Sequence, residues 1–348
     1  MADQGVVLSS RGSVALEEIR VDPPGPAEVL VRIGATGVCH SDLHVIEEDG
    51  WGHSYPVLLG HEGAGTVEAV GPGVDMLDPG DRVVIGWKTA CGECAPCLRG
   101  SPRHCKRPPA APGRLHRKDG TDLTPVLRTG TFATHTVVPQ AAAVKMPAAL
   151  PFEQACLIGC AVATGVMSVL ATANVWKGAR VAVIGCGAVG LSVIQGARLA
   201  GASEIRALDV DERKLEQATR FGATHTDPTQ TGPGQADFVF DVVGRGETFE
   251  QALSLVGSGG TVVLIGLSPA EERATLSLPS LFAKRTRILV SHGGDHLPLE
   301  DFPRLAQLAL DGKLDLAGMV TRTAPLDEWS EALDAMKDGS VIRTVLTP

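Results

Sequence analysis

VAVIGCGAVG, residues 181–190, is the stretch of sequence that decides the fold of this chain. Its four leading apolar residues predict a buried strand, and an apolar helix is expected at residues 191–199. In the G-x-G-x-x-G between them, the first glycine permits a tight turn, the second lets a pyrophosphate approach the backbone, and the third lets helix and strand pack closely. Free N–H groups and the helix dipole favour phosphates at the helix N-terminus. The residues expected to contact a dinucleotide in this turn are Gly185, Gly187, Ala188, Val189 and Gly190.

Asp209 follows the next apolar strand, expected at residues 204–208. A carboxylate at this position accepts hydrogen bonds from the adenosine ribose and repels a 2′-phosphate, so NAD is expected rather than NADP. Lys214 could assist from the following turn. Alternatively, Asp209 merely caps a helix expected at residues 211–221, as aspartate often does.

Helices alternate with apolar strands from about residue 152, whereas the first 150 residues are rich in Gly, Pro and Val with short strand patterns. The alternation predicts an α/β protein with a doubly wound parallel sheet of the Rossmann type, beside a mostly β lobe. Strands are expected at residues 29–33, 66–70, 82–85, 132–138, 180–184, 204–208, 237–242, 261–265, 287–290 and 341–346. Helices are expected in the tail at residues 302–310 and 326–337, and residues 107–127 predict a long surface loop.

Composition limits the classes of function. With 348 residues, 44% of them hydrophobic and 20% charged, the chain is typical of a soluble globular protein with two domains. Its net charge of −9 argues against binding to a phosphate backbone, and no apolar run reaches the roughly 18 residues of a spanning helix. The opening MADQGVVLSSRG lacks the regions of a secretion signal. We therefore expect a cytoplasmic protein without nucleic-acid or membrane partners, whose cysteines stay reduced.

Four cysteines are spaced as ligands of a structural zinc ion: Cys91, Cys94, Cys97 and Cys105. Two-residue gaps let successive thiolates converge on one ion, and a fourth ligand after a short excursion closes the tetrahedron. Disulfides are poorly supported without a secretion signal, while an iron–sulfur cluster remains an alternative. His104 could replace a cysteine if one of the four were not bound.

Cys39, His61 and Cys160 are candidates for a second zinc site. Two thiolates and one imidazole leave the fourth position open, where an alcohol oxygen can bind and lose its proton more readily. Each residue also has a plain structural alternative, since free cysteines are usually buried. Spacing alone does not bring the three together.

The chain resembles the zinc-dependent alcohol dehydrogenases of the medium-chain dehydrogenase/reductase superfamily, essentially from end to end. In pattern it is most similar to class III-like and bacterial NAD-dependent members. The motifs that carry the resemblance are GVCHSD at 37–42, GHEGAG at 60–65, GDRV at 80–83, the cysteine segment 91–105, GCAVATG at 159–165, GCGAVG at 185–190 and IRTVL at 342–346. The resemblance implies a GroES-like catalytic domain at residues 1–158 with a structural zinc lobe at 88–108, an NAD-binding domain at 159–291, and a segment at 292–348 that returns to the catalytic domain.

The resemblance also implies roles for single residues. Cys39, His61 and Cys160 would hold the catalytic zinc, and the four spaced cysteines the structural one. Glu62 would lie behind the catalytic metal. Ser41 would hydrogen-bond the alcohol and His44 would complete a proton relay through the cofactor ribose, unless His44 is only an exposed loop imidazole. The remaining cofactor contacts would be His40, Thr164 and Arg343.

Some features depart from the family pattern. One extra residue between His44 and His61 makes the loop 47–54, with Trp51 and His53, particular to this chain. Trp87 matches a pocket position, and with Trp51 it predicts a largely apolar substrate site, unless the two indoles are plain core. The intermediate length of the loop 106–131 favours a homodimer, with a tetramer as the alternative.

Three functions are compatible with these residues. The first is zinc- and NAD-dependent interconversion of a primary or secondary alcohol with its aldehyde or ketone. The alternative is a thiol-adduct enzyme, which oxidises S-hydroxymethyl-glutathione or its mycothiol counterpart, or reduces an S-nitrosothiol. Against the glutathione version, Pro108-Pro109 replace an expected basic residue, with Arg107 offset. The third, a non-catalytic NAD or redox sensor, predicts loss of a zinc ligand or of Ser41, and none is lost.

Overall fold

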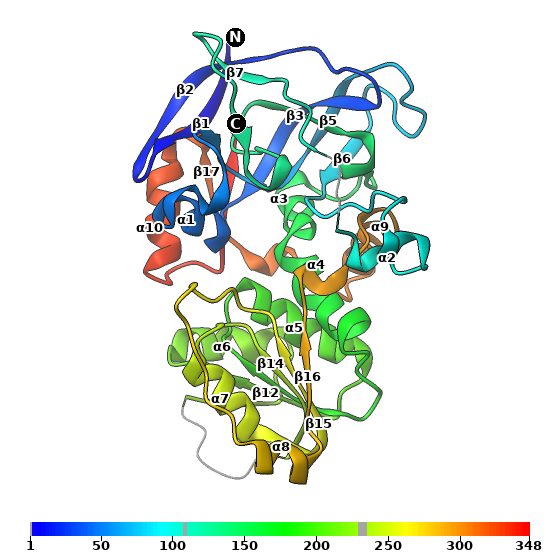
Figure 1. Ribbon diagram of the computed structural model, residues 1–348, viewed down its shortest axis with the longest axis vertical. Helices are drawn as coiled ribbons and strands as arrows, with labels where there is room; N and C mark the ends of the chain where they lie inside the picture. The colour runs from blue at the N-terminus through cyan, green and yellow to red at the C-terminus, as the bar shows by residue number, and fades with distance from the viewer. Residues whose placement is uncertain (1, 107–109, 229–234) are drawn as a thin grey trace. The chain divides into compact units, whose positions relative to one another are not determined.

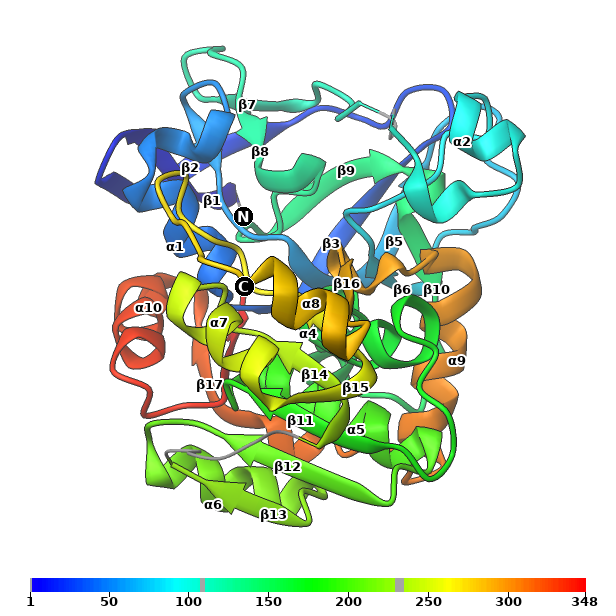
Figure 2. The same cartoon turned by 60° about the horizontal axis from the view of Figure 1, so that its bottom comes forward.

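The computed structural model describes residues 2–106, 110–228 and 235–348. The sequence argument against a glutathione-dependent enzyme concerns Arg107, Pro108 and Pro109. These three residues lie outside the described residues. The chain forms two compact units, one made of Met1–Cys160 with Leu297–Pro348 and the other of Ala161–His296 (Figures 1 and 2).

The unit Ala161–His296 contains a six-stranded parallel sheet in the order β13-β12-β11-β14-β15-β16. Its strands are β11 (Arg180–Ile184), β12 (Glu204–Leu208), β13 (His225–Asp227), β14 (Ala236–Asp241), β15 (Val256–Leu264) and β16 (Arg287–Val290). Its helices are α4 (Ala161–Met167), α5 (Ala188–Ala200), α6 (Glu212–Phe221), α7 (Gly246–Leu255) and α8 (Leu278–Lys284). The strand order reverses next to β11, as in a doubly wound Rossmann sheet, so the predicted α/β fold is confirmed.

The five strands expected in this sheet are present, and two of them, β14 and β15, have other ends than expected. The strand expected at 261–265 starts five residues earlier, at Val256, because Val256 itself pairs with Ala236 of β14, before a register shift after which Thr261 pairs with Phe238. Helix α6 is capped by Asp211, whose side chain accepts a hydrogen bond from Arg213 N. The interpretation of Asp209 as the cap of this helix is therefore wrong.

The other unit is mostly β. One sheet has the order β7-β2-β1-β4-β8, and the other has the order β10-β6-β5-β3-β18-β17 with β9 paired to β3. The strands are β1 (Asp3–Ser10), β2 (Ser13–Val21), β3 (Glu28–Gly37), β4 (Val57–Leu58), β5 (Glu62–Val70), β6 (Arg82–Ile85), β7 (Leu115–Arg117), β8 (Thr124–Pro125), β9 (His135–Pro139), β10 (Ala143–Lys145), β17 (Val320–Pro325) and β18 (Arg343–Thr347). The helices are α1 (His40–Glu47), α2 (Ala95–Leu98), α3 (Phe152–Ala155), α9 (Pro298–Leu310) and α10 (Trp329–Lys337).

Pairing between distant segments positions the candidate site. The C-terminal strand β18 pairs with β3, with Val345 opposite Gly37. On the other side of β3, Gly37 lies opposite Glu62 of β5. The chain segments that precede α1 and β5 are therefore held next to each other and next to the C-terminal strand.

The expected long surface loop at 107–127 is wrong in part. Within it, β7 pairs with β2, and both Leu115 and Leu123 are buried in a cluster with Val7 and Leu58. These two leucines lie among Gly, Pro, Arg and Asp, so the polar composition concealed an apolar contact with the first sheet. The strand expected at 132–138 begins at His135.

No single helix among the described residues is long and apolar enough to cross a membrane. The consecutive helical segments Phe152–Gly159 and Ala161–Thr172 pass that test only as a pair, by length and composition.

Candidate functional site

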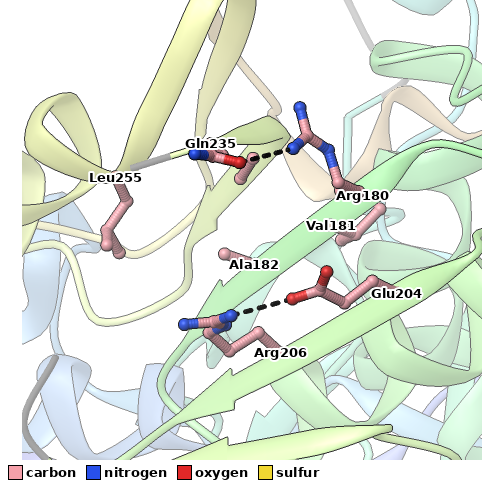
Figure 3. A pocket seen from close by; sticks show the side chains of 8 residues that line it. Arg180, Val181, Ala182, Glu204, Arg206, Gln235 and Leu255 are labelled. Atoms are coloured by element: carbon pink, nitrogen blue, oxygen red, sulfur yellow. Dashed lines mark hydrogen bonds and ion pairs between the residues drawn. The ribbon is translucent and has the colours of Figure 1, made fainter. Parts of the chain in front are cut away.

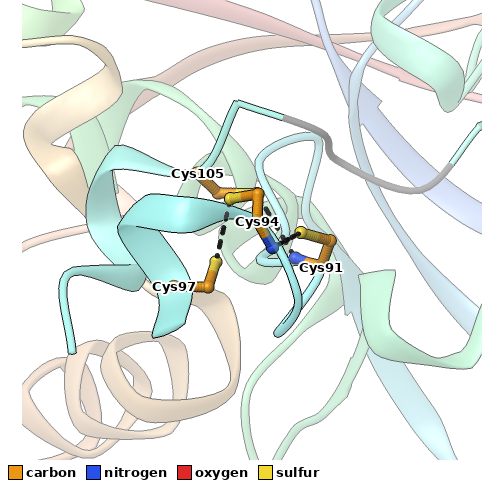
Figure 4. A group of neighbouring side chains, drawn as sticks. All are labelled: Cys91, Cys94, Cys97 and Cys105. Atoms are coloured by element: carbon orange, nitrogen blue, oxygen red, sulfur yellow. Dashed lines mark hydrogen bonds between the residues drawn. The ribbon is translucent and has the colours of Figure 1, made fainter. Parts of the chain in front are cut away.

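The four spaced cysteines converge on one point. Their sulfur atoms all lie within 4.8 Å of one another (Figure 4). Cys94 Sγ is 3.5 Å from Cys97 Sγ and 3.8 Å from Cys105 Sγ. With Zn–S bonds of about 2.3 Å, the edge of a ZnS₄ tetrahedron is about 3.8 Å. The four-cysteine group, Cys91, Cys94, Cys97 and Cys105, therefore fits a single, fully ligated zinc ion, and its sulfurs are too close together to surround a multi-atom iron–sulfur cluster.

Local hydrogen bonds prepare this group for a cation. Cys94 N donates to Cys91 Sγ and Cys91 N donates to Cys105 Sγ, each at 3.3 Å. The backbone N–H of Lys106, followed by that of Cys97, lowers the pKa of Cys94 to about 6. Burial, followed by the Cys94 sulfur, raises the pKa of Cys97 to about 12. Crowded thiols of this kind can all ionise only if a cation joins them.

The alternatives for these cysteines can be judged from the same geometry. All eight cysteines of the chain are free, so the disulfide reading is wrong. His104 is exposed and does not belong to the group, which has four sulfurs without it.

Cys39, His61 and Cys160 also come together, and all three are buried. Their ligand atoms lie within 4.8 Å of one another. Cys39 is the N-cap of α1, His61 directly precedes β5, and Cys160 follows the 3-10 turn Cys156–Gly159. The β3–β5 pairing brings the first two together, while Gly159 packs so closely against the Ile85 carbonyl that a Cβ would lie 2.8 Å from it. The structure thus supplies the proximity that the spacing of this Cys-His-Cys group does not reveal.

Asp42 orients the imidazole of this group, a role that the sequence analysis missed. Its buried carboxylate lies 3.1 Å from His61 Nδ1 and accepts hydrogen bonds from Cys39 N at 3.2 Å and Gly60 N at 3.1 Å. The buried Nε2 of His61 has no hydrogen-bond partner among the described residues. A carboxylate on one imidazole nitrogen with a buried, unused second nitrogen is the arrangement of a metal-ligating histidine. The available signal was an acidic residue three positions after Cys39, where its side chain takes part in the capping box at the start of α1.

The pKa shifts of the three ligands also indicate a metal site. A hydrogen bond from the Cys160 thiol lowers the pKa of Cys39, and the same contact raises the pKa of Cys160. Burial acts to lower the pKa of His61, but Asp42 and the Cys39 sulfur together raise it well above its ordinary range. The pair of sulfurs therefore shares one negative charge, and a divalent cation would let both become thiolates. The two groups fit one structural and one catalytic zinc ion.

Glu62 and Arg343 form a buried ion pair beside the Cys-His-Cys group, with Arg343 Nε 3.4 Å from Glu62 Oε2. Arg343 Nη1 also donates to the Val38 carbonyl at 2.7 Å. Burial acts to lower the pKa of Arg343, and Glu62, Cys39 and Cys160 outweigh it, so the pKa is raised. Arg343 thus balances the negative charge of Glu62 and the thiolates. Its contact with the cofactor stays a prediction.

Ser41 and His44 lie on α1, the helix that Cys39 caps. Ser41 is half-buried, and its hydroxyl makes no hydrogen bond within the described part of the chain. His44 belongs to the last turn of the helix rather than to a loop, and its Nδ1 is 2.7 Å from Glu48 Oε1. His40, in the first turn, is exposed.

The glycine-rich turn has the geometry expected for a dinucleotide. Gly185 has φ +92°, and its N–H donates to the Leu208 carbonyl at 2.8 Å. A Cβ on Gly190 would lie 1.9 Å from the Gly185 carbonyl oxygen, whereas a Cβ on Gly187 would meet nothing within 4 Å. The first and third glycines are therefore required by the fold, and the second borders open space in front of Ala188 and Val189, the first residues of α5.

Asp209 ties this turn to the end of β12. Its Oδ2 accepts from Cys186 N at 2.7 Å and its Oδ1 from Asp211 N at 3.0 Å. Lys214 lies near enough to Asp211 to help lower the pKa of that carboxyl, after Arg213 and its hydrogen bonds. Thr164 is buried in α4, and its carbonyl accepts from Ser168 Oγ at 2.6 Å.

A separate hollow of about 150 Å³ opens at the amino ends of the parallel strands (Figure 3). Its arginines are already engaged, since Arg206 pairs with Glu204 at 2.9 Å and Arg180 donates to Gln235 at 3.1 Å. Parallel sheets bind nucleotides at the carboxyl ends of their strands. This hollow is therefore not assigned to the cofactor.

Known proteins and protein families match this chain along most of its length. Residues 25–148 match the family model of the alcohol dehydrogenase GroES-like domain, and residues 188–311 match that of zinc-binding dehydrogenases. S-(hydroxymethyl)glutathione dehydrogenase of Paracoccus denitrificans is 34% identical over 374 residues, which cover 97% of this chain and 100% of that protein.

Solved structures of dehydrogenases are also similar to this chain. An alcohol dehydrogenase zinc-binding domain protein from Burkholderia ambifaria has a TM-score of 0.93 at 31% identity, covering 100% of this chain and 99% of that one. Benzyl alcohol dehydrogenase from Acinetobacter calcoaceticus has a TM-score of 0.90 at 28% identity with the same coverage. The chain belongs to the zinc-dependent alcohol dehydrogenase family of the medium-chain dehydrogenase/reductase superfamily, and it is an oxidoreductase that acts on the CH–OH group.

Proposed function

We propose that this protein catalyses the reversible oxidation of a primary or secondary alcohol to its aldehyde or ketone, with NAD as hydride acceptor. The observation that carries the proposal is the buried Cys-His-Cys group with the unused Nε2 of His61. The unit Met1–Cys160 with Leu297–Pro348 would be the catalytic domain and Ala161–His296 the NAD-binding domain. The domain boundaries expected from the sequence, at residues 158 and 291, are part of this proposal.

The ligands of the catalytic zinc would be Cys39, His61 and Cys160. When bound there, zinc supplies a Lewis acid that lowers the pKa of an alcohol and polarises a carbonyl. Asp42 keeps His61 Nε2 directed to the site, and the Glu62–Arg343 pair offsets the charge of the thiolates. Cys91, Cys94, Cys97 and Cys105 would hold the structural zinc, which has no open position for a substrate.

Ser41 and His44 would remove the proton that alcohol oxidation releases. The Ser41 hydroxyl would accept the hydroxyl proton of the alcohol while it gives up its own proton toward the His44 imidazole. The reaction balances, because the alcohol loses a hydride to the nicotinamide and a proton to this relay.

The cofactor would lie on the turn Gly185–Gly190, with its pyrophosphate at the first residues of α5. When bound there, NAD would supply the acceptor for the hydride of the substrate carbon. Asp209, with Lys214 nearby, would bind the adenosine ribose and disfavour a 2′-phosphate. Thr164, His40 and Arg343 would complete the cofactor contacts.

The test is NADH formation by the purified protein across a graded panel of alcohols, before and after treatment with a chelator. We expect chelation to abolish turnover, to leave NAD binding intact, and to be reversed by added Zn²⁺. Full activity in a zinc-free preparation would contradict the proposal.

A thiol-adduct reaction is the second candidate, and the relative from Paracoccus denitrificans supports it. Formaldehyde oxidation measured with no thiol, with glutathione and with mycothiol separates the two candidates. Rates that rise only when one thiol is present would favour the adduct enzyme, while thiol-independent oxidation of simple alcohols would favour the first candidate.

We further propose a homodimer in the cytoplasm. The edge strand β16 exposes Val290 by 67%, and the nearby helix α8 exposes Phe282 by 89%. An exposed apolar edge strand is suited to pairing with a second copy. Light scattering should give the mass of two chains, and Val290→Lys should produce monomers; a tetramer is the alternative outcome for the wild type. The free cysteines fit a reducing compartment.

A further inference from the structure

His44 and Glu48 form a close pair at the end of α1. His44 Nδ1 lies 2.7 Å from Glu48 Oε1, and the two side chains are 30% and 39% exposed. The Glu48 backbone N–H also donates to the His44 carbonyl at 2.8 Å. Both the side chain and the backbone of Glu48 are therefore tied to His44.

This contact decides which nitrogen of His44 can act. A carboxylate only accepts hydrogen bonds, so Nδ1 carries the hydrogen and Nε2 is left as the acceptor. In the part of the chain that the structure describes, no other carboxylate pairs with His44. Glu48 thus fixes the tautomer that a proton-accepting histidine needs.

The loop 47–54, which carries Glu48 onward, is held in place by hydrogen bonds of the His53 side chain. The His53 ring joins the loop to the segment Val126–Arg128, since Nδ1 donates to the Gly50 carbonyl at 2.9 Å and Nε2 accepts from Leu127 N at 3.2 Å. The Trp51 ring lies with its centroid 6.3 Å from that of His44. The position of the His44 ring is therefore restricted by Trp51 on the loop as well as by Glu48.

Neighbouring charged groups are engaged elsewhere or lie apart from the pair. Glu47 pairs with Lys337 of α10 at 3.0 Å, and Asp49 accepts from the Tyr55 hydroxyl at 3.1 Å. Further titratable or charged groups are His40 and Asp42 in the first turn of α1, His53 on the loop, and Arg11, which acts on Tyr55. Asp42 is committed to His61, Cys39 N and Gly60 N.

We infer that Glu48 is a positioning residue of the proton relay, one that holds His44 with Nε2 ready to accept and stabilises the imidazolium that forms. The inference rests on the proposed function. In each oxidation, the alcohol hydroxyl proton arrives at Nε2, the imidazolium gives one proton to solvent water at its exposed edge, and the Nδ1–H form returns. No further oxidant or reductant takes part.

The test compares Glu48→Ala, Glu48→Gln and a matched control, Glu47→Gln, which removes the same charge from the neighbouring position of α1. Glu48→Ala should lower kcat for alcohol oxidation about tenfold, with the KM for NAD unchanged. Glu48→Gln keeps an acceptor for the Nδ1 hydrogen but loses the charge, so its kcat should fall less than that of Glu48→Ala. Glu47→Gln should leave kcat unchanged. Circular dichroism checks that each variant is folded.

Two further measurements distinguish positioning from a general structural effect. Sodium formate should restore part of the kcat of Glu48→Ala and leave the wild type unchanged. In a His44→Gln background, Glu48→Ala should have no further effect, because the two residues act as one unit. Equal losses in both backgrounds, or a wild-type kcat in Glu48→Ala, would overturn the inference. An inactive wild type would instead refute the proposed function, and a His44→Gln variant with full kcat would refute only the relay.

Discussion

The four-cysteine group and the Cys-His-Cys group both fit a zinc ion, but the chain assembles them in different ways. The first comes from residues 91–105 and lies in one lobe of the first unit. The second joins three distant segments, and its members are buried behind Asp42 and the Glu62–Arg343 pair. A local chelate that is fully ligated can stabilise the fold, whereas a buried set with one position to spare can take part in chemistry. The difference therefore predicts opposite consequences of losing a ligand.

The largest expected effect is on turnover, at the Cys-His-Cys group. His61→Gln removes the imidazole ligand, and loss of Lewis-acid stabilisation worth several kcal/mol should lower kcat/KM about a thousandfold or more. The fold should persist, because the sheets that frame the site do not depend on the metal. Steady-state NADH formation and circular dichroism check the two expectations. The matched control is Cys156→Ala, a buried thiol outside the group. An active His61→Gln enzyme, or equal loss in the control, would break the comparison.

The next effect is on stability, at the four-cysteine group. Cys94→Ser should lower the free energy of unfolding by about 4 kcal/mol or more, since loss of a metal is one of the few causes of such large changes. The activity per folded molecule should stay close to that of the wild type. Denaturant titration followed by activity at a temperature where the variant is folded separates the two. Selective loss of turnover in a fully stable variant would contradict the division of roles.

A smaller effect is expected behind the catalytic ligand. Asp42→Asn keeps the shape of the side chain but removes the charge that orients His61 through Nδ1. Loss of such a hydrogen-bonded partner should weaken zinc binding by about 10- to 100-fold. Competition with a metal-binding dye measures this affinity, and the four-cysteine group should keep its zinc. Unchanged affinity at both sites would mean that Asp42 serves only as the helix cap.

The smallest effect is expected at His104. This exposed imidazole lies beside Cys105 but outside the set of four sulfurs. His104→Ala should therefore change the free energy of unfolding by less than about 0.5 kcal/mol and leave the zinc content at its wild-type value. Loss of one zinc per chain would show that the histidine has replaced a cysteine as ligand.

The two groups also differ in how far the sequence alone could predict them. The four-cysteine group and the glycine-rich turn are local, so the spacing of Cys91 to Cys105 and of Gly185 to Gly190 already contains their geometry. The Cys-His-Cys group depends on the pairing of β3 with β5, which no local pattern encodes. Its members were found as candidates, and the resemblance to a family suggested that they belong together.

Most of the features that the sequence did not reveal depend on tertiary contacts. Asp42 lies within the motif GVCHSD, but its role exists only where the chain brings Gly60 and His61 beside it. Leu115 and Leu123 were assigned to a surface loop, since two isolated leucines give no period until the first sheet provides a surface for them. Asp209 could be either a cap or a ribose ligand, and the capping role belongs to Asp211.

Stepwise removal of zinc tests the central claim most directly. The purified wild type should contain two zinc ions per chain, and titration with a chelator should be followed by zinc content, NADH formation and melting temperature in the same samples. We predict that one zinc is linked to turnover, so that its removal abolishes NADH formation at a nearly constant melting temperature, and that removal of the other lowers the melting temperature. Loss of activity and stability in strict proportion, or activity that survives removal of both ions, would contradict the account.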